Sequence, residues 1–485
     1  MNYLNKSIRK IHTALVNKEV SCVELVREAL RKIQADKCNA FELVLEEEAL
    51  KEAAFLDTLG IEEDNLFYGI PYVCKDNIST KGIITTGGSE ILKDYIPLYD
   101  AKVIEILKSK KAILVAKTTL DELAMGGTGL SNHLGVQKNP LDHTRIIGGS
   151  SSGSAIATLE GVTPFALGSD TGDSVRKPAS YGGIVGYKGT YGSISRYGLF
   201  SFCPSLDHIG FFTRNVEDSA LVFDLLNQID ELDLTSSRRE RIKTFPLLNK
   251  SLKGKKVCLI KEINESFKDS IAYPDYLKSI EDLKKEGVVF EEVSISSALL
   301  QALYPAYIVI SSSEATSNNA CLDGIKYGMR VKGSSYEEII SETRTQGFGE
   351  LIKRRFILGA YALRSEEQNN TYLRAKRVRR LIVEEIEKIF KDYDYLYTLA
   401  SRIRAPKIDK KTDNLDVSKL IADNILALGN FGGYPSITIP LAFYDHLPIG
   451  VNITGRAFED GEVFALASLL EKLIGIKDFS VEEES

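Results

Sequence analysis

Two loops rich in serine and glycine lie close together in the sequence, and they constrain the fold more than any other feature. Residues 148–178 contain six serines, six glycines and few bulky side chains. Glycine loses more backbone freedom on folding than any other residue, so such a cluster weakens a core unless the backbone itself has a task. Loops of this kind bring hydroxyls and main-chain N–H groups to one reacting atom. The sequence therefore predicts a serine-based acyl-transfer centre.

A buried lysine is the second part of the predicted centre. A serine hydroxyl is a weak nucleophile until a base removes its proton. Lysine acts as that base only when it is neutral, so burial or nearby positive charge must lower its pKa. Lys75 follows the largely apolar run 70–74, which predicts a buried strand. We therefore expect the Lys75 amine to emerge from the desolvated end of that strand.

Three motifs in this order resemble those of the amidase signature family, and the similarity extends over most of the chain. They are residues 69–77, 148–154 and 168–176. The resemblance implies that Ser174 is the nucleophile and that Lys75 is the general base. It also implies that Ser150, on a cis peptide bond, passes the proton from Ser174 to Lys75.

Backbone N–H groups around the nucleophile are expected to form an oxyanion hole, each donor being worth roughly 10²–10³ in rate. The residues concerned are Thr171, Gly172, Asp173 and Ser174. Asp173 stands where the family usually has glycine. We expect its side chain to point outward, because Arg176 and Lys177 are close enough to neutralise it. Ser152 also replaces a family glycine, which implies a negative φ or a tolerated strain at that position.

Three other catalytic patterns are less well supported. Residues 149–153 match the G-x-S-x-G nucleophile elbow, but the preceding residues 142–145 are polar and do not form an apolar strand. The D-T-G segment 170–172 resembles an aspartic-protease loop, but the chain has no second copy of it. A Ser-His-Asp triad would need a histidine in a supporting motif. The five histidines lack one: His12, His133, His143, His208 and His446.

Composition narrows the class of protein. A net charge of −6 argues against autonomous nucleic-acid binding. No apolar stretch approaches the ~20 residues that cross a bilayer, and the first residues lack a signal-peptide core. The six cysteines form no CxxC pair and no metal-ligand spacing. We therefore expect a cytoplasmic protein with reduced thiols, no membrane contact, and neither a metal nor a cofactor bound by this chain.

The apolar pattern predicts an α/β fold in which residues 61–475 form one large domain, a mixed β-sheet with helices on both faces. Residues 1–60 are expected to form a helical segment packed on that core, and residues 476–485 an acidic tail. Strands are expected over 70–74, 112–116, 164–168, 183–187, 256–260, 393–398 and 436–440. Helices are expected over 120–125, 155–160, 216–228, 276–286 and most of 299–389, and a polar loop over 403–417.

Four further stretches are similar to one branch of the family, the A subunits of glutamyl-tRNA(Gln) amidotransferases. They are residues 191–199, 205–210, 312–318 and 353–359. A free amino acid amide needs a fixed cation and a fixed anion in its pocket. Matching this branch assigns Arg355, or its neighbour Arg354, to the substrate carboxylate and Asp423 to the α-ammonium. Met125 and Tyr307 would line the pocket wall. A helix-surface arginine pair, a helix-capping Asp423 and plain core filling are the alternatives.

The resemblance implies that this chain hydrolyses glutamine through a glutamyl-enzyme ester and releases ammonia. In the family complex a B subunit uses that ammonia, with ATP and Mg²⁺, to convert Glu-tRNA(Gln) to Gln-tRNA(Gln), and a C subunit wraps the A subunit. This chain has no G-x-x-x-x-G-K-[ST] loop of its own. The alternatives are a free-standing amidase for another small amide and a catalytically inactive scaffold subunit. The sequence leaves open whether Asp-tRNA(Asn) or asparagine is also used.

Overall fold

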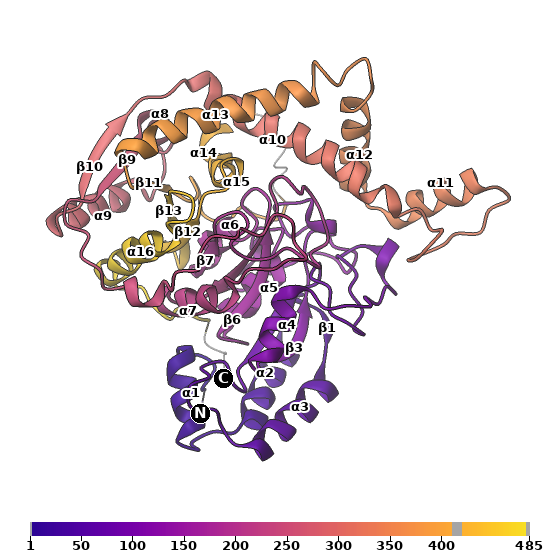
Figure 1. The fold of residues 1–485 in the computed structure, drawn as a ribbon, viewed down its shortest axis with the longest axis horizontal. Coiled ribbons are helices and arrows are strands. Elements are labelled where there is room, and N and C mark those ends of the chain that lie inside the picture. Colours follow the sequence, from indigo (N-terminus) through magenta and orange to yellow (C-terminus); the bar gives the residue numbers. More distant parts are fainter. Residues whose placement is uncertain (1, 410–419, 482–485) are drawn as a thin grey trace.

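Strand β2 (Pro71–Lys75) is buried along its whole length and ends at Lys75, as the apolar run before this lysine predicts. The structure is a computed structural model that describes residues 2–409 and 420–481. Strand β2 belongs to an eleven-stranded sheet (Figure 1). The strand order is β1 (Phe41–Val44), β3 (Ile113–Thr118), β2, β6 (Phe165–Asp170), β8 (His208–Thr213), β7 (Val185–Lys188), β12 (Ser436–Tyr444), β13 (Leu447–Gly455), β11 (Tyr395–Leu399), β9 (Lys256–Ile260) and β10 (Val289–Val293).

The sheet is mixed, as predicted, and its parallel part brings together the motif of Lys75 and the motif of Ser174. Strand β2 pairs in parallel with both β3 and β6, whereas β8 pairs with β6 in the antiparallel sense. The carboxyl ends of neighbouring parallel strands meet at one edge of a sheet. Lys75 and Asp170, the last residues of β2 and β6, therefore lie at the same edge, and the Ser174 loop follows directly.

Helices cover both faces of the sheet, which confirms the predicted layering. Successive side chains of a strand point to opposite faces. On β8, Phe212 packs in one core cluster with α5 (Ser152–Leu159) and α6 (Arg176–Gly182), while Phe211 belongs to the main core. On that second face lie α7 (Val216–Leu226) and α16 (Asp460–Ile474), whose phenylalanines surround Tyr187.

The amino-terminal segment is less helical than predicted. Helices α1 (Ile8–Val16), α2 (Cys22–Ala35) and α3 (Glu46–Leu59) form, and α2 begins with the expected capping box of Ser21 and Glu24. Between them, however, β1 pairs antiparallel with β3 and becomes an edge strand of the main sheet. Four residues are too few to show a strand period in the sequence, so this part of the prediction was wrong.

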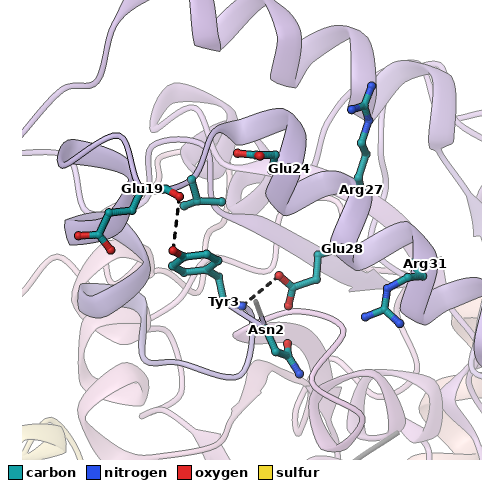
Figure 2. A pocket seen from close by; sticks show the side chains of 8 residues that line it. Asn2, Tyr3, Glu19, Glu24, Arg27, Glu28 and Arg31 are labelled. Carbon is teal, nitrogen blue, oxygen red and sulfur yellow. Dashed lines mark hydrogen bonds between the residues drawn. The ribbon is translucent and has the colours of Figure 1, made fainter. Parts of the chain in front are cut away.

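The first residues fold back onto α2 (Figure 2). The Tyr3 and Leu4 N–H groups donate to the two carboxylate oxygens of Glu28, and the Tyr3 hydroxyl donates to the Glu19 carbonyl. A surface pocket of about 560 Å³ lies here. Its lining includes none of the residues predicted for the active site.

The predicted helix over 120–125 is a short 3₁₀ turn, η2 (Glu122–Ala124). Leu123 and Ala124 both have positive φ, which an α-helix of L-residues does not continue. The Asp121 carboxylate instead accepts hydrogen bonds from the backbone N–H groups of residues 128–131. This loop contact replaces the helix.

The predicted helical region after residue 299 is confirmed. It contains α10 (Ser297–Asn318), α11 (Tyr336–Gly347), α12 (Glu350–Ala362) and α13 (Tyr372–Asp392). In Figure 1, α11 lies at the far end of this region, away from the sheet. The remaining elements are α4 (Lys102–Ser109), α8 (Lys261–Ser266), α9 (Tyr273–Lys285), α14 (Leu420–Asn424), α15 (Ala427–Phe431), and the small hairpin of β4 (Lys138–Asn139) and β5 (Asp142–Ile146).

The carboxyl-terminal residues are partly ordered against the core. Phe479 packs on Phe443, and the Val481 N–H donates to the Leu159 carbonyl. Residues 482–485 of the expected acidic tail, and 410–417 of the expected polar loop, lie outside the described residues. In the described part of the chain, no helix is both long enough and apolar enough to cross a membrane.

Candidate active site

The Lys75 side chain ends in a cage of serine hydroxyls. Its Nζ lies 2.8 Å from Ser150 Oγ, 2.9 Å from Ser151 Oγ and 2.9 Å from Ser169 Oγ. Burial lowers the pKa of Lys75 to about 7, although nearby carboxylates act in the opposite direction. A neutral amine has a lone pair that can take a proton. The structure thus places Lys75 beside Ser150, as predicted for a general base and a bridging hydroxyl.

Asp121 packs against Gly149 and holds the Ser150 loop in place. The peptide bond between Gly149 and Ser150 is cis. A Cβ on Gly149 would lie 2.0 Å from Asp121 Oδ2, so only glycine fits there. The Asp121 N–H also donates to the Ser150 carbonyl oxygen at 3.1 Å. Asp121 therefore links the Ser150 loop to the loop that follows η2.

Ser174 lies in the loop between β6 and α6, next to the Ser150 loop. The Ser151 N–H donates to the Ser174 carbonyl oxygen at 3.2 Å, which joins the two loops. Ser174 is 5% exposed. Its hydroxyl has no hydrogen-bond partner in residues 2–409 and 420–481. Proton transfer from Ser174 to Ser150 accordingly stays a prediction, and it requires the Ser174 hydroxyl to turn towards Ser150.

The backbone N–H groups predicted to form the oxyanion hole make no hydrogen bond to other described residues. Within the described residues, the N–H groups of Thr171, Gly172, Asp173 and Ser174 donate no hydrogen bond. The loop is nevertheless fixed, because the Gly172 carbonyl accepts from Arg176 Nη2 at 2.8 Å and the Thr171 hydroxyl donates to Asp207 at 2.7 Å. Fixed donors without partners can stabilise an oxyanion with little reorganisation.

Arg176 pairs with Asp170 and not with Asp173. Arg176 Nη2 lies 2.9 Å from Asp170 Oδ1, and neither side chain is exposed. Burial alone would raise the pKa of Asp170, but the Arg176 guanidinium holds it below its usual range. Arg176 also donates to the carbonyl of Leu426 at 2.6 Å and to Asn430 Oδ1 at 2.6 Å. The loop is thereby attached to the carboxyl-terminal part of the chain.

The charges of Lys177 and Arg176 both act on Asp173, as predicted, but neither side chain forms an ion pair with it, and its outward orientation stays a prediction. Arg176 is occupied by Asp170, and Lys177 Nζ donates to the carbonyls of Ala400 and Asp423. The Asp173 carboxyl group is half-buried and has no hydrogen bond or ion pair with any described residue. Burial raises its pKa to about 6. A carboxylate without a paired cation therefore lies next to the nucleophile.

Tyr307, on α10, covers the loop that carries the nucleophile. A Cβ on Gly172 would lie 3.0 Å from Tyr307 Oη, so the ring packs directly on this glycine. Burial raises the pKa of Tyr307 well above its usual value, and the charge of Arg355 opposes that shift. Arg355 is therefore near enough for its charge to act on the Tyr307 hydroxyl, and the assignment of both residues to one substrate pocket stays a prediction.

The structure distinguishes between the two arginines proposed for the substrate carboxylate. Arg354 is exposed on α12. Arg355 turns inward: its Nε and Nη1 are buried without a hydrogen-bond partner in the described residues, and its Cζ lies 5.5 Å from the centre of the Phe202 ring. A buried cation without a partner is costly unless an anion is bound. Arg355 is thus the arginine that can hold a carboxylate.

The other two predicted pocket residues are placed less clearly. Met125 is fully buried at the end of η2. The Asp423 side chain is 49% exposed and lies 3.8 Å from Arg402 Nε. No contact in the described residues joins Asp423 to Arg355, so its role with an ammonium group stays a prediction.

Sequence reasoning missed two of the serines that surround Lys75. Ser169 Oγ accepts from both Lys75 Nζ and Asn77 Nδ2, and Ser151 Oγ donates to the Ser169 carbonyl. Both serines lie inside the two motifs already identified. The many hydroxyl groups in these two motifs were a usable signal. A buried amine needs several polar partners, so a buried Lys75 should contact more than one serine.

Comparisons with known proteins identify the family of this chain. A family model described as Amidase matches residues 24–464. The A subunit of glutamyl-tRNA(Gln) amidotransferase from Streptococcus pneumoniae serotype 19F is 39% identical over 482 residues, which cover 97% of this chain and 96% of that protein. The corresponding A subunit from Pediococcus pentosaceus is 39% identical over 480 residues and 97% of both chains. The crystal structure of the A subunit from Thermotoga maritima matches with a TM-score of 0.78 at 32% identity, over 97% of this chain and 95% of that chain.

Proposed function

This chain belongs to the amidase family, and on that basis we propose that it is the glutaminase subunit of a tRNA-dependent amidotransferase. The observation that carries the proposal is the fully buried Lys75 amine, which lies 2.8 Å from Ser150 Oγ and has its pKa lowered to about 7. A lysine in this state can accept a proton near neutral pH. An inactive scaffold subunit would have no need of such a group.

In the proposed reaction, Ser174 Oγ attacks the side-chain carbonyl carbon of glutamine. The hydroxyl proton passes through Ser150 to Lys75, and the carbonyl oxygen becomes an oxyanion held by the N–H groups of residues 171–174. Collapse of this intermediate breaks the C–N bond, and the leaving amine takes up the proton as ammonia. Water then attacks the glutamyl ester, returns a proton to Ser174 and releases glutamate.

Glutamine is the proposed substrate because the half-buried Arg355 has two guanidinium nitrogens, Nε and Nη1, that are buried without a hydrogen-bond partner in the described residues. The Arg355 guanidinium has the fork geometry that matches a carboxylate. Tyr307 packs on Gly172 of the Ser174 loop and is acted on by the charge of Arg355, which supports a substrate that is held at Arg355 and extends its amide to Ser174. We propose that Asp423 supplies the anion for the α-ammonium group after a local rearrangement.

We infer the partners from the names of the relatives, which are subunits of a multi-subunit enzyme. A B subunit would use the ammonia, together with ATP and Mg²⁺, to convert Glu-tRNA(Gln) to Gln-tRNA(Gln). A C subunit would bind this chain. ATP and Mg²⁺ would act in the B subunit, and no step in the mechanism above passes through them.

Ammonia release from glutamine tests the proposal. Wild-type protein should hydrolyse glutamine, and Ser174→Ala and Lys75→Ala should not. Addition of the B and C subunits, ATP and Glu-tRNA(Gln) should increase ammonia release strongly. If another small amide were hydrolysed faster than glutamine and no partner co-purified, the chain would be a free-standing amidase. If the two variants released as much ammonia as the wild type, the proposed site would be wrong.

A further inference from the structure

The loop that carries Ser174 leaves the sheet beside a buried carboxylate, Asp207. Strands β6 and β8 are antiparallel, and Asp170 on β6 pairs with His208 on β8. Thr171 and Asp207 are therefore the next two residues beyond this pair. The Thr171 hydroxyl donates to Asp207 Oδ1 at 2.7 Å, and both residues are buried. Asp207 thus fixes the residue that supplies the first of the predicted oxyanion donors.

The second carboxylate oxygen of Asp207 holds a different segment. Asp207 Oδ2 accepts hydrogen bonds from the N–H groups of Phe202 and Cys203, at 3.0 and 2.9 Å. The Phe202 ring is buried, and its centre lies 5.5 Å from Cζ of Arg355. A cation over an aromatic ring is attracted by the negative face of that ring. One carboxylate therefore connects the oxyanion loop to the ring that contacts the proposed substrate-binding arginine.

The hydrogen bonds of Asp207, and not its charge, are the property that suits the proposed reaction. Burial raises the pKa of the Asp207 carboxyl group, whereas its three hydrogen bonds and the charge of Arg196 act in the opposite direction. Burial lowers the pKa of Lys75, and the charge of Asp207 opposes that shift. The charge therefore works against a neutral Lys75, so any benefit of Asp207 to catalysis comes from the geometry that it fixes.

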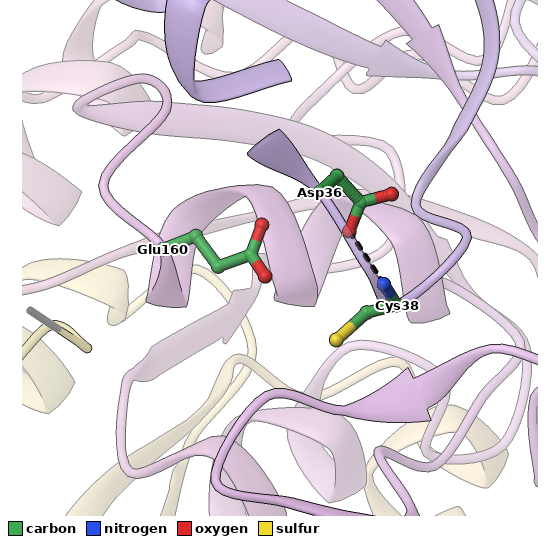
Figure 3. A group of neighbouring side chains, drawn as sticks. All are labelled: Asp36, Cys38 and Glu160. Atoms are coloured by element: carbon green, nitrogen blue, oxygen red, sulfur yellow. Dashed lines mark hydrogen bonds between the residues drawn. The ribbon is translucent and has the colours of Figure 1, made fainter. Parts of the chain in front are cut away.

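Another group of carboxylates makes no such connection. Asp36 and Glu160 lie near Cys38 at the carboxyl-terminal end of α5 (Figure 3). Burial raises the pKa values of Glu160 and Cys38, and the charges of Lys32 and Lys138 oppose these shifts. No hydrogen bond within residues 2–409 and 420–481 joins this group to the nucleophile loop. The position of Asp207 between two parts of the proposed site is thus not shared by this group.

We propose that Asp207 is a positioning residue that fixes the separation between the oxyanion donors and Arg355. Through Thr171 it orients the donors that act on the substrate carbonyl oxygen, and through Phe202 it orients the cation that binds the substrate carboxylate. A misplacement of about 1 Å can cost 10²-fold in rate. The role through Phe202 rests on the proposed glutaminase function, whereas the role through Thr171 applies to any acyl transfer at Ser174.

Steady-state kinetics of glutamine hydrolysis separate the two roles. Thr171→Val removes the hydroxyl at similar size and should lower kcat at least about tenfold, with KM changed less than about twofold. Thr171→Ser keeps a hydroxyl donor and should restore most of kcat. Phe202→Leu should raise KM roughly 3- to 30-fold, the size of a desolvated cation–π contact, with kcat little changed. Both Thr171→Val and Phe202→Leu leave the charge of Asp207 in place.

Asp207→Ala should combine the two effects and both lower kcat and raise KM. Asp207→Asn should lie between Asp207→Ala and the wild type, because its amide oxygen still accepts from the Phe202 and Cys203 N–H groups and its amide nitrogen can donate to the Thr171 hydroxyl. If Asp207→Ala fails to fold, the variants of Thr171 and Phe202 still decide the question.

Asp460 offers a matched control. It is buried at the start of α16 and accepts hydrogen bonds from the Thr190 hydroxyl and N–H group, at 2.6 and 2.9 Å. Thr190 is 3% exposed, as is Thr171. Thr190→Val should destabilise the fold in chemical denaturation but change kcat and KM less than about twofold. A merely structural role of Thr171 would make Thr171→Val behave in the same way.

Reaction with phenylmethylsulfonyl fluoride tests the role of Thr171 without glutamine. Ser174 Oγ attacks the sulfur, the S–F bond breaks, fluoride leaves and the hydroxyl proton passes to the base. The wild type should react, Thr171→Val should react several-fold more slowly, and Phe202→Leu should react at the wild-type rate.

The outcomes distinguish this inference from the proposed function. A wild type that reacts with the fluoride but does not hydrolyse glutamine would contradict the glutaminase function, while a slowed Thr171→Val would still support positioning. Wild-type kcat and wild-type labelling in Thr171→Val would overturn the positioning role through Thr171. An unchanged KM in Phe202→Leu would overturn the role through Phe202. A wild type inactive in both assays would overturn the inference and the function together.

Discussion

Asp170 and Arg176 form an ion pair of 2.9 Å that is completely buried at the start of the nucleophile loop. Removing the arginine leaves a buried carboxylate without a cation, which costs about 3–5 kcal/mol. Arg176→Met should therefore lower the free energy of unfolding by that amount in chemical denaturation. Arg380→Met is the matched control, because Arg380 pairs with Glu384 on the surface, and it should cost less than about 1 kcal/mol. Equal stability of the two variants would contradict this prediction.

Lys75 should set the pH dependence of glutamine hydrolysis. The neutral amine is the active form, and burial lowers its pKa to about 7. The turnover rate should therefore rise with pH, with a midpoint near 7, and level off above it. Lys75→Ala should lose this rise together with roughly 10²–10⁴-fold in rate. A midpoint near 10, the value of a solvated lysine, would show that the amine is not desolvated in solution.

Asp173 should slow the reaction above its own pKa. The carboxylate is negative above about pH 6, where it opposes the negative charge that develops on the oxyanion. At an effective dielectric constant of about 20, repulsion between two such charges within one site is worth about 1–2 kcal/mol. Asp173→Gly should therefore raise kcat roughly 5- to 30-fold at pH 8 and change it little at pH 5. Asp173→Asn removes the charge at similar size and should act in the same direction. A drop in kcat for both variants at pH 8 would assign the carboxylate a positive role instead.

Arg355 should determine the affinity for glutamine. Loss of a charge-assisted hydrogen bond to a carboxylate costs about 1.5–3 kcal/mol. Arg355→Gln should therefore raise KM roughly 10- to 100-fold, whereas Arg354→Gln, at the exposed neighbour on α12, should change it less than about twofold. Steady-state kinetics on the two variants make the comparison. The reverse order of effects would assign the pocket to Arg354.

Much of the fold could be predicted because it follows from local patterns. The apolar run before Lys75 identified a buried strand, and the strand over 256–260 matches β9 residue for residue. Strand β1 was missed because its stability comes from pairing with β3 far along the chain. The turn at Leu123 and Ala124 was missed because helix propensity does not reveal the competing contacts of Asp121.

The site was predictable to the extent that its motifs are contiguous. Lys75 and Ser150 meet as expected, since each lies in a recognisable segment. The ion pair of Arg176 could not be assigned from the sequence, because Asp170 and Asp173 are both near it, and only the fold shows that it reaches Asp170.

The hydrogen bonds from Arg176 to Leu426 and Asn430 also bear on synthesis of the protein. A ribosome has translated Lys75, Ser150 and Ser174 long before it reaches residue 426. Until then the Arg176 guanidinium lacks two of its hydrogen-bond acceptors, the Leu426 carbonyl and the Asn430 side chain. The nascent chain thus contains Lys75, Ser150 and Ser174 before these hydrogen bonds can form. We therefore expect the loop that carries Ser174 to become fixed only after residues 426–430 have been made.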